Sequence, residues 1–455
     1  MIFFNAVVLY VPSIALHSTV GISRQYSILA IGLMCVVYSA IGGLKAVVWT
    51  DFFQAMLMYG SIIIVGVIGT GEAGGIAKVF EAAAEGGRLN LDGFFKFDLV
   101  ARHTFWTIML GSTIKHVYVV GVNQVQIQRA LSLSSLKQGQ LAFVFCSIFT
   151  ALIVALSTYM GLVMYSAYRS CDPFMAHEVP RRDTAIIHFV FTQLGSFPGL
   201  RGIFVAGVFS ATLSTLSSFA NSMAALTLEN FIKPLMQNLG HKELTESKAT
   251  WTAKALATVF GIACVAVAYI VDKANSRLLQ VTQTMFGAIG VPFLAAFAMG
   301  IFTRFVNSVG ILSGFAVTLS LGSYITIYQT FYKPALKPLL PVYYNDQCAK
   351  VFNGTMASDL LPSIEMISHW PGVVPIVEEA SSFSLSEISY MALPILQMLI
   401  MIVVAPLVSL LTGGLQQEID DKYLVSILHK DNKKSERTTV ETSDGINEDS
   451  IVSRI

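Results

Sequence analysis

The stretch from Gly207 to Pro234 reads GVFSATLSTLSSFANSMAALTLENFIKP and combines an apolar, membrane-length run with a high density of hydroxyl groups. A transmembrane helix needs about 20 mostly apolar residues, and no charged residue occurs here before Glu229. The hydroxyl groups belong to Ser210, Thr212, Ser214, Thr215, Ser217 and Ser218. Small and hydroxyl residues let membrane helices approach closely and form interhelical hydrogen bonds. The stretch therefore predicts a helix inside a membrane bundle.

A second interpretation of the same stretch is a cation site. Ala211, Ser214 and Thr215 stand at i, i+3 and i+4, so one helical face can present two hydroxyls and a carbonyl. Neutral oxygen ligands suit a hard monovalent cation such as Na⁺, because hard ions prefer oxygen to nitrogen or sulfur. From the residues alone, both helix packing and a sodium site remain open.

The composition of the whole chain agrees with a membrane protein. Of its 455 residues, 54% are hydrophobic and 13% are charged, whereas an ordinary soluble domain carries about 25% charged residues. Lys and Arg total 29 against 28 Asp and Glu, and this balance argues against a nucleic-acid partner. The apolar runs contain no GxSxG, GxxxxGK or HExxH motif and no paired carboxylates. We therefore expect a transporter or a signalling protein rather than an enzyme, without a cofactor.

Reading outward from Gly207, about ten apolar runs predict an all-α polytopic membrane protein in contact with the lipid bilayer. The runs begin near Ile2, Tyr26, Phe52, Thr104, Gly139, Gly202, Ala255, Leu278, Val306 and Ile388. We expect a membrane domain over residues 1–412. The remainder, 413–455, is charged and poor in aromatic residues, so we expect a disordered cytoplasmic tail.

Orientation follows from one sequon and from parity. Asn353-Gly354-Thr355 is a glycosylation acceptor sequence, which places its segment outside the cell. The extracellular loops are then about 72–103, 169–199 and 333–386, and the short loops left inside are basic, as the positive-inside tendency requires. Cys171 and Cys348 share the outer face, where an oxidising compartment allows a disulfide between them.

Four long segments also give the chain a family resemblance. They are YSAIGGLKAVVWTDFFQ from Tyr38, FWTIMLGS with YVVGVNQVQIQRALS from Phe105, FSATLSTLSSFANSMAALTLENFIKP from Phe209, and FGAIGVPFLAAFAMGIF with NSVGILSG from Phe286. In this order they resemble the sodium/solute symporter family, which includes the sodium/glucose cotransporters. The resemblance is nearest to the branch of sodium-coupled monocarboxylate, multivitamin and iodide transporters. It implies a plasma-membrane protein with the leucine-transporter type of inverted-repeat helical bundle, in which substrate binds near the bilayer midplane between discontinuous helices.

The resemblance also implies a sodium site. The paired hydroxyls of the family fall on Ser214 and Thr215, and its carbonyl ligand falls on Ala211, which is the same helical face that the spacing indicates. The Asp of the family's threonine-aspartate motif matches Asp51, where it would attract sodium leaving toward the cytoplasm. The alternative for Asp51 is a capping or interfacial carboxylate.

The implied substrate contacts depart from the branch. Where the branch has a Trp and then a Tyr before GVNQ, this chain has His116 and Val120, and Lys115 replaces a small or neutral residue. An intramembrane Lys is costly and points to function, so Lys115 would attract a carboxylate while His116 donates a hydrogen bond. Alternatively, Lys115 snorkels or pairs with a loop acid, and His116 bonds a backbone carbonyl. Phe293 and Phe297 match positions that line the family's substrate cavity, but i, i+4 aromatic residues are otherwise ordinary core.

In the family, about three spans precede the one that begins at Ile2, and these supply the other half of the sodium site. We therefore expect an N-terminally truncated chain whose full-length parent is a Na⁺-coupled symporter for a small organic anion, monocarboxylate- or vitamin-like. The alternative is a non-transporting membrane protein that binds or regulates an intact homologue. An in-frame coding extension upstream of Met1 favours the first hypothesis, and a stop codon favours the second.

The chain ends in Ser453-Arg454-Ile455, with a hydroxyl two places before an apolar C-terminal residue. PDZ domains bind such ends by β-strand addition and by capture of the terminal carboxylate. We therefore expect a PDZ-domain partner; the alternative is simply the end of a disordered tail.

Overall fold

The computed structural model describes residues 2–328, 388–416 and Leu424, apart from short gaps at 92, 102, 175, 177, 180–181, 241–243, 274–281, 283 and 285. The described part is built from helices and the turns between them. The first half contains α1 (Ile2–Val20), α2 (Arg24–Glu72), α3 (Ile76–Glu85), η1 (Thr107–Ser112), α4 (Thr113–Gly121), α5 (Gln124–Leu131) and α6 (Leu136–Tyr168). The second half contains η2 (Arg182–Thr184), α7 (Ala185–His188), η3 (Phe189–Gln193), α8 (Leu200–Thr227), η4 (Leu228–Ile232), α9 (Lys233–Asn238), α10 (Glu246–Lys273), η5 (Phe286–Gly290), α12 (Val291–Phe302), α13 (Ser308–Ile327), α16 (Leu393–Leu411) and η8 (Gly414–Gln416).

Side-chain caps begin several of these helices. Ser23 caps α2, and Ser135 caps α6, each accepting a hydrogen bond from a backbone N–H of the first turn. Asn307 caps α13 through Gly310 N at 2.9 Å. Asn123 caps α5 by accepting from Val125 N at 3.0 Å, so the chain changes direction between α4 and α5. These caps lie between apolar runs and therefore fix where one helix stops and the next begins.

Seven helices among the described residues are long and apolar enough to cross a membrane. They are Ile2–Val20, Val47–Glu72, Leu136–Tyr168, Leu200–Asn238, Glu246–Asp272, Ser308–Ile327 and Leu393–Leu411. Each corresponds to one of the ten predicted runs. The remaining three runs, which begin near Tyr26, Thr104 and Leu278, have a different structure from the single span expected for each.

The run from Tyr26 does not end before the run from Phe52, because both lie in the continuous 49-residue helix α2. A helix of this length extends about 73 Å, more than twice the roughly 30 Å of a hydrocarbon core. The segment contains no proline, and Gly42 and Gly43 each cost only about 1 kcal/mol in a helix interior. The break that two separate runs imply between Tyr26 and Phe52 therefore does not form in the backbone.

The run from Thr104 is divided into η1, α4 and α5. Within the run from Leu278, the structure has the shorter apolar helix Phe286–Phe302. Both segments include a π-helical turn, η1 in the first and η5 in the second. Such turns interrupt regular α-helix and occur often at functional sites. The structure thus shows a break between α4 and α5, and π-helical turns in both segments, where the sequence predicts simple spans.

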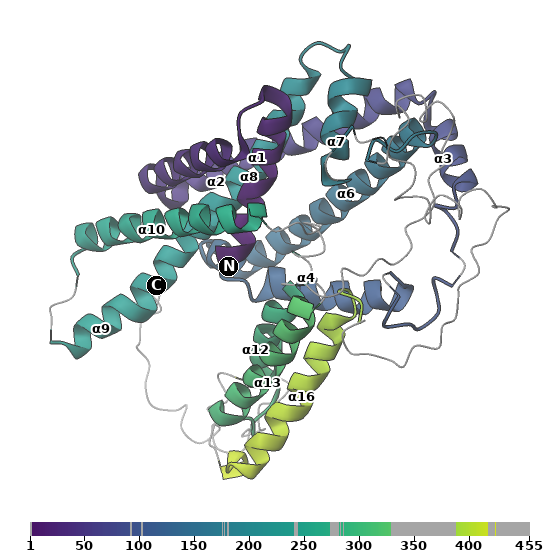
Figure 1. Ribbon diagram of the computed structural model, residues 1–455. Coiled ribbons are helices and arrows are strands. Elements are labelled where there is room, and N and C mark those ends of the chain that lie inside the picture. The colour runs from purple at the N-terminus through teal and green to yellow at the C-terminus, as the bar shows by residue number, and fades with distance from the viewer. Residues whose placement is uncertain are drawn as a thin grey trace.

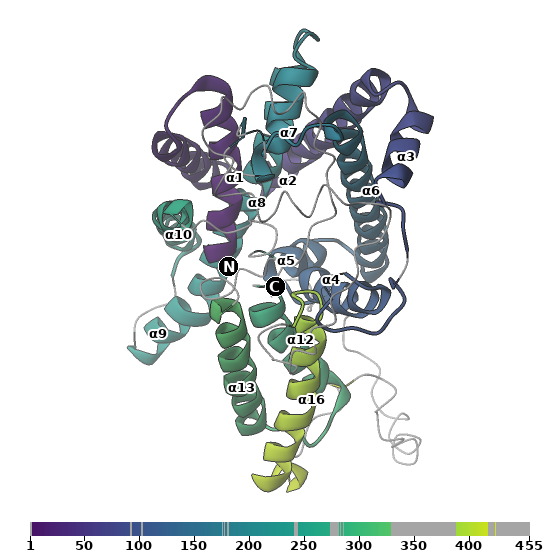
Figure 2. The same cartoon turned by 45° about the vertical axis from the view of Figure 1, so that its right-hand side comes forward.

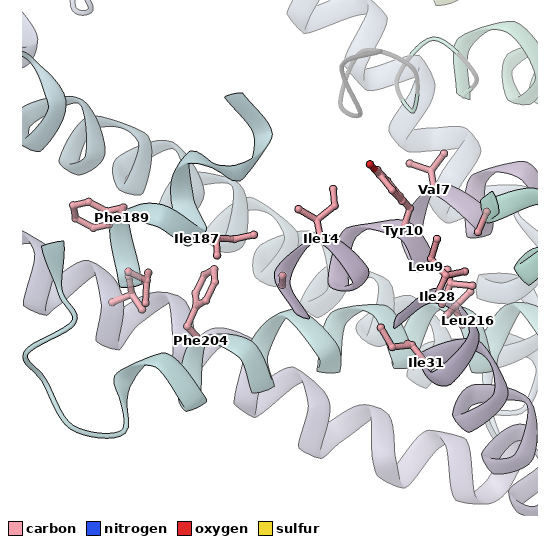
Figure 3. Packing of buried hydrophobic residues seen from close by; sticks show 14 of the residues in the cluster. Val7, Leu9, Tyr10, Ile14, Ile28, Ile31, Ile187, Phe189, Phe204 and Leu216 are labelled. Carbon is pink, nitrogen blue, oxygen red and sulfur yellow. The ribbon is translucent and has the colours of Figure 1, made fainter. Parts of the chain in front are cut away.

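The helices form two groups (Figure 1). In the first group, α1, α2, α8 and α10 pack against one another, and α6 and α3 lie beside α2. In the second group, α12, α13 and α16 pack together, and α4 contacts both α12 and α16 (Figure 2). The first group holds the larger hydrophobic core, whose members include Val7, Leu9, Tyr10 and Ile14 of α1, Ile28 and Ile31 of α2, and Leu216 of α8 (Figure 3).

Two hydrogen bonds join the loop before η1 to the start of α16, nearly 300 residues later in the chain. Ser389 N donates to Leu99 O at 2.8 Å. His103 Nε2 lies 2.7 Å from Tyr390 Oη, and the two rings meet edge to face. The loop therefore lies against the second helix group, close to α4.

Candidate functional site

The first candidate site lies where α2 packs against α8. Close packing here depends on Gly207, because a Cβ at this position would lie 2.5 Å from Cβ of Ser61. Half-buried Ser214 of α8 faces Asp51 of α2 across this interface, and its Oγ donates to Asp51 Oδ1 at 2.6 Å. The structure therefore brings together two residues that the sequence separates by 163 positions.

Thr215 and Ala211 complete the predicted set of oxygen ligands on α8. Thr215 Oγ1 donates to the Ala211 carbonyl at 2.9 Å, so both oxygens lie on one helical turn. Both residues are half-buried, as Ser214 is. Of the predicted residues, Ser214 thus contacts Asp51 and Thr215 contacts Ala211, and the candidate ligand atoms of all four are oxygens.

Arg129, at the end of α5, was not among the predicted site residues. Its Nη2 forms an ion pair with Asp51 Oδ2 and also donates to Ser218 Oγ. The side chains of Arg129 and Asp51 are 32% and 15% exposed, and Ser218 is buried. One signal for this role was present in the sequence: Arg129 closes the short polar helix QVQIQRAL in a chain with few charges.

The carboxylate of Asp51 therefore contacts side chains of two different kinds. Ser214 contributes a hydroxyl donor, and Arg129 contributes a positive charge that is also held by Ser218. A partly buried carboxylate needs such partners, because removal from water disfavours its charged form. The cluster formed by Asp51, Arg129, Ser214 and Ser218, here named the Asp51 cluster, joins α2, α5 and α8.

The second candidate site surrounds Lys115 of α4. Lys115 is buried, and its Nζ donates to Met391 Sδ at 3.1 Å. Ser112 Oγ donates to the same sulfur at 3.6 Å. Gly111 of η1 allows the backbone at Met391 to come close, because a Cβ at this position would collide with the carbonyl oxygen of Met391. Lys115 thus lies where α4 meets the residues that lead into α16.

The other predicted substrate residues share the helices of this second site but differ in their surroundings. His116 and Val120 are half-buried on α4. Phe293 and Phe297 lie on α12, which contacts α4, but they are 45% and 56% exposed. The ring of Phe293 packs against Phe315 of α13 at a centroid distance of 4.8 Å. The two phenylalanines are therefore not enclosed in the way that the lining of a cavity would be.

Tyr118 is the aromatic residue of α4 that is enclosed, and the sequence reasoning did not select it. Its ring is buried and lies 6.4 Å from that of Phe286 in η5. A Cβ at Gly290 would collide with the same ring. Phe286 also lies 4.7 Å from Phe4 of α1, which makes it a link between the two helix groups. In the sequence, the signal that could have selected Tyr118 was its position two residues after His116.

The remaining predicted sites fall partly outside the described residues. Cys171 is disulfide-bonded, whereas Cys35, Cys146 and Cys264 are free thiols. Cys348 and Asn353 lie outside the described residues, and so does the chain end proposed for a PDZ domain. The Cys171–Cys348 pairing, the glycosylation of Asn353 and the disordered tail over 413–455 stay predictions.

Comparison with known proteins gives one consistent result. The sequence model of the sodium:solute symporter family matches residues 2–318. Sodium-coupled monocarboxylate transporter 1 of Homo sapiens is 34% identical over 433 residues, which cover 93% of this chain and 68% of that protein. The putative sodium-dependent multivitamin transporter of Drosophila melanogaster is 33% identical, with 86% of this chain and 62% of that protein covered.

A solved structure shares the fold. A Na⁺-coupled sialic acid symporter in a substrate-bound, outward-open state matches with a TM-score of 0.65 at 17% sequence identity. The match covers 90% of this chain and 71% of that one. The chain spans about two thirds of the length of the human and fly relatives.

Proposed function

The chain belongs to the sodium:solute symporter family, and on that basis we propose that it couples the movement of a small organic anion to the entry of Na⁺ across the plasma membrane. The anion is monocarboxylate- or vitamin-like. Family membership and the span-length apolar helices make the chain a multi-pass membrane protein with the leucine-transporter type of fold. The ion, the anion and the residues that bind them are the content of the proposal.

The observation that carries the proposal is a group of oxygen atoms on one turn of α8, one of which contacts Asp51 of α2. One turn of α8 carries Ser214 Oγ, Thr215 Oγ1 and the Ala211 carbonyl. The Asp51 carboxylate of α2 accepts a hydrogen bond from Ser214 Oγ. Oxygen ligands suit Na⁺, and neutral hydroxyl and carbonyl ligands hold a monovalent ion weakly enough to release it in each cycle. Na⁺ binds at Ala211, Ser214 and Thr215 and passes Asp51 on its way to the cytoplasm.

The proposed anion site is the surroundings of Lys115. A thioether sulfur is a weak hydrogen-bond acceptor, whereas a carboxylate forms a charge-assisted bond with an ammonium group that is about twice as strong as a neutral one. A substrate carboxylate would therefore be a stronger acceptor for Lys115 Nζ than the Met391 sulfur that Nζ contacts. His116, one residue further along α4, donates a second hydrogen bond in this arrangement.

An uptake experiment tests the proposal directly. Cells that express the protein are given labelled butyrate or its neutral amide, in sodium buffer or in choline buffer of equal ionic strength. We expect butyrate to accumulate in sodium buffer only, and we expect the amide not to accumulate. The same assay with a panel of longer monocarboxylates and acidic vitamins then ranks the substrates. Equal uptake in the two buffers, or equal uptake of acid and amide, would contradict the proposal.

A further inference from the structure

The Asp51 cluster holds a positive charge on the route proposed for sodium. Arg129 pairs with Asp51, and its second hydrogen bond to Ser218 keeps it beside the α8 turn that carries Ser214 and Thr215. Two cations cannot both take the same carboxylate at full strength, because like charges at close range repel. Arg129 and Na⁺ would therefore compete for the carboxylate of Asp51.

We propose that Arg129 is a built-in competitor of sodium: its guanidinium occupies Asp51 in the sodium-free protein and is displaced as Na⁺ enters or leaves the site. The inference rests on the proposed function and deepens it by naming the residue that sets sodium affinity. Arg129 acts through Asp51 and Ser218 and is therefore a positioning residue.

The position of Arg129 allows such an exchange. It is the one charged residue of α5, an eight-residue helix with no buried residue, whereas Asp51 and Ser218 belong to long helices of the main core. Its side chain keeps 32% of its exposure, so water can take over its hydrogen bonds when it leaves Asp51. The carboxylate, less exposed at 15%, stays behind. The mobile member of the pair is thus the cation.

The exchange also explains why Ser214 donates to Asp51. A hydroxyl has one donor and two acceptor lone pairs, so Ser214 can keep its bond to Asp51 Oδ1 while a lone pair turns to Na⁺. Arg129 holds the other carboxylate oxygen, Oδ2. Departure of the guanidinium leaves Oδ2 unoccupied beside the arriving ion. Release of Na⁺ and return of Arg129 to Asp51 then occur in the same step.

The test is the sodium concentration for half-saturation in Arg129→Gln, measured on the purified protein by ²²Na⁺ binding and by the sodium-dependent rise in melting temperature. Loss of the competitor is expected to lower this concentration about five-fold, the magnitude of a partly exposed ion pair. Turnover in the uptake assay falls at the same time, because tighter sodium leaves more slowly. Arg129→Lys keeps the charge and is expected to return the half-saturation concentration toward the wild-type value.

Two further variants separate competition from a structural role. Ser218→Ala removes the second anchor of Arg129 and is expected to lower the half-saturation concentration by about two-fold, less than loss of the whole Arg129 charge. Arg169→Gln breaks an ion pair of the same type with Glu85, away from the site, and is expected to leave the half-saturation concentration of sodium unchanged. Ser218→Ala also keeps the test decisive where Arg129→Gln does not fold.

The outcomes distinguish this inference from the proposed function. An unchanged or raised half-saturation concentration in Arg129→Gln and Ser218→Ala, with wild-type sodium binding intact, overturns the competition and leaves sodium coupling standing. Absence of sodium binding in the wild-type protein overturns both. A lowered concentration in Arg129→Gln, restored by Lys and unaffected by Arg169→Gln, supports the exchange.

Discussion

The α2–α8 interface and the α4–α16 contact each enclose a charged side chain, but they treat it differently. At the first, Asp51 faces an opposite charge and a hydroxyl, both supplied by the protein itself. At the second, Lys115 donates to the sulfur of Met391, which is a weak acceptor. The first arrangement is closed until another cation competes for it. A substrate carboxylate is a stronger acceptor for an ammonium group than a thioether, which is why we assign sodium to the first region and the anion to the second.

The largest effect that would break this comparison is expected from the hydroxyls of α8. Ser214→Ala or Thr215→Ala removes a sodium ligand and should raise the sodium concentration for half-maximal uptake at least ten-fold, the scale on which changes around bound metal ions act. Surface expression should remain near the wild-type level. Ser222→Ala, a buried serine further along the same helix, is the matched control. Unchanged sodium dependence in both variants would return these hydroxyls to helix packing.

The next effect concerns the second region. Lys115→Met removes the charge but keeps a side chain of similar length, so the KM for an anionic substrate should rise about ten-fold, as expected for loss of one charge-assisted hydrogen bond. The sodium concentration for half-saturation should stay at the wild-type value. The control is Lys137→Met, an exposed lysine at the start of α6. A KM that stays constant, or that rises only together with the sodium requirement, would contradict the division of roles.

A stability measurement sharpens the comparison at two glycines. Gly207→Ala places a methyl group against the backbone-linked Cβ of Ser61, so α2 and α8 must separate, at a cost of about 1–3 kcal/mol. Gly314→Ala in α13 meets Met401 Sδ, at 2.6 Å, whose flexible side chain can move aside at lower cost. Both changes gain the same helix propensity, so the difference in melting temperature isolates the packing. Equal melting temperatures would show that the α2–α8 interface yields as easily as the second helix group.

The smallest expected effect lies in the loop that contacts α16. Tyr390→Phe removes the hydroxyl that lies 2.7 Å from His103 Nε2 and should destabilise the protein by about 1 kcal/mol, the usual net value of one hydrogen bond. Sodium dependence and KM should stay unchanged, because neither candidate site contains this pair. A change in KM alone would extend the anion site toward the loop.

The sequence predicts the fold class and the grouping at α8 well, for identifiable reasons. Charge-free runs locate seven of the ten expected spans because the hydrocarbon core imposes a minimum length on an apolar helix. The face shared by Ala211, Ser214 and Thr215 follows from helical periodicity, and the family resemblance adds Asp51. Continuous α2 was missed because a lone Lys and two glycines look like a boundary while remaining compatible with a helix.

The contacts between distant segments could not be predicted in the same way. The pairing of Arg129 with Asp51 joins residues 78 positions apart, and no local period records that contact. Phe293 and Phe297 were transferred from the family by position, but exposure depends on the neighbouring helices, which a match of positions does not specify. Tyr118 is enclosed because Gly290 has no side chain to displace it, a relation between two segments that appears only once they are folded.

The ion pair of Asp51 and Arg129 has an electrical consequence. Without Na⁺, the charges of Asp51 and Arg129 cancel; with Na⁺ bound, Asp51, the displaced Arg129 and the ion together carry one net positive charge. A membrane potential acts on net charge, by about 2.3 kcal/mol per elementary charge for each 100 mV crossed. A negative cell interior therefore pulls the loaded cluster inward and exerts no net force on the empty one. Entry of Na⁺ into the cluster and its release should accordingly depend on voltage, while the sodium-free cluster adds no voltage dependence of its own.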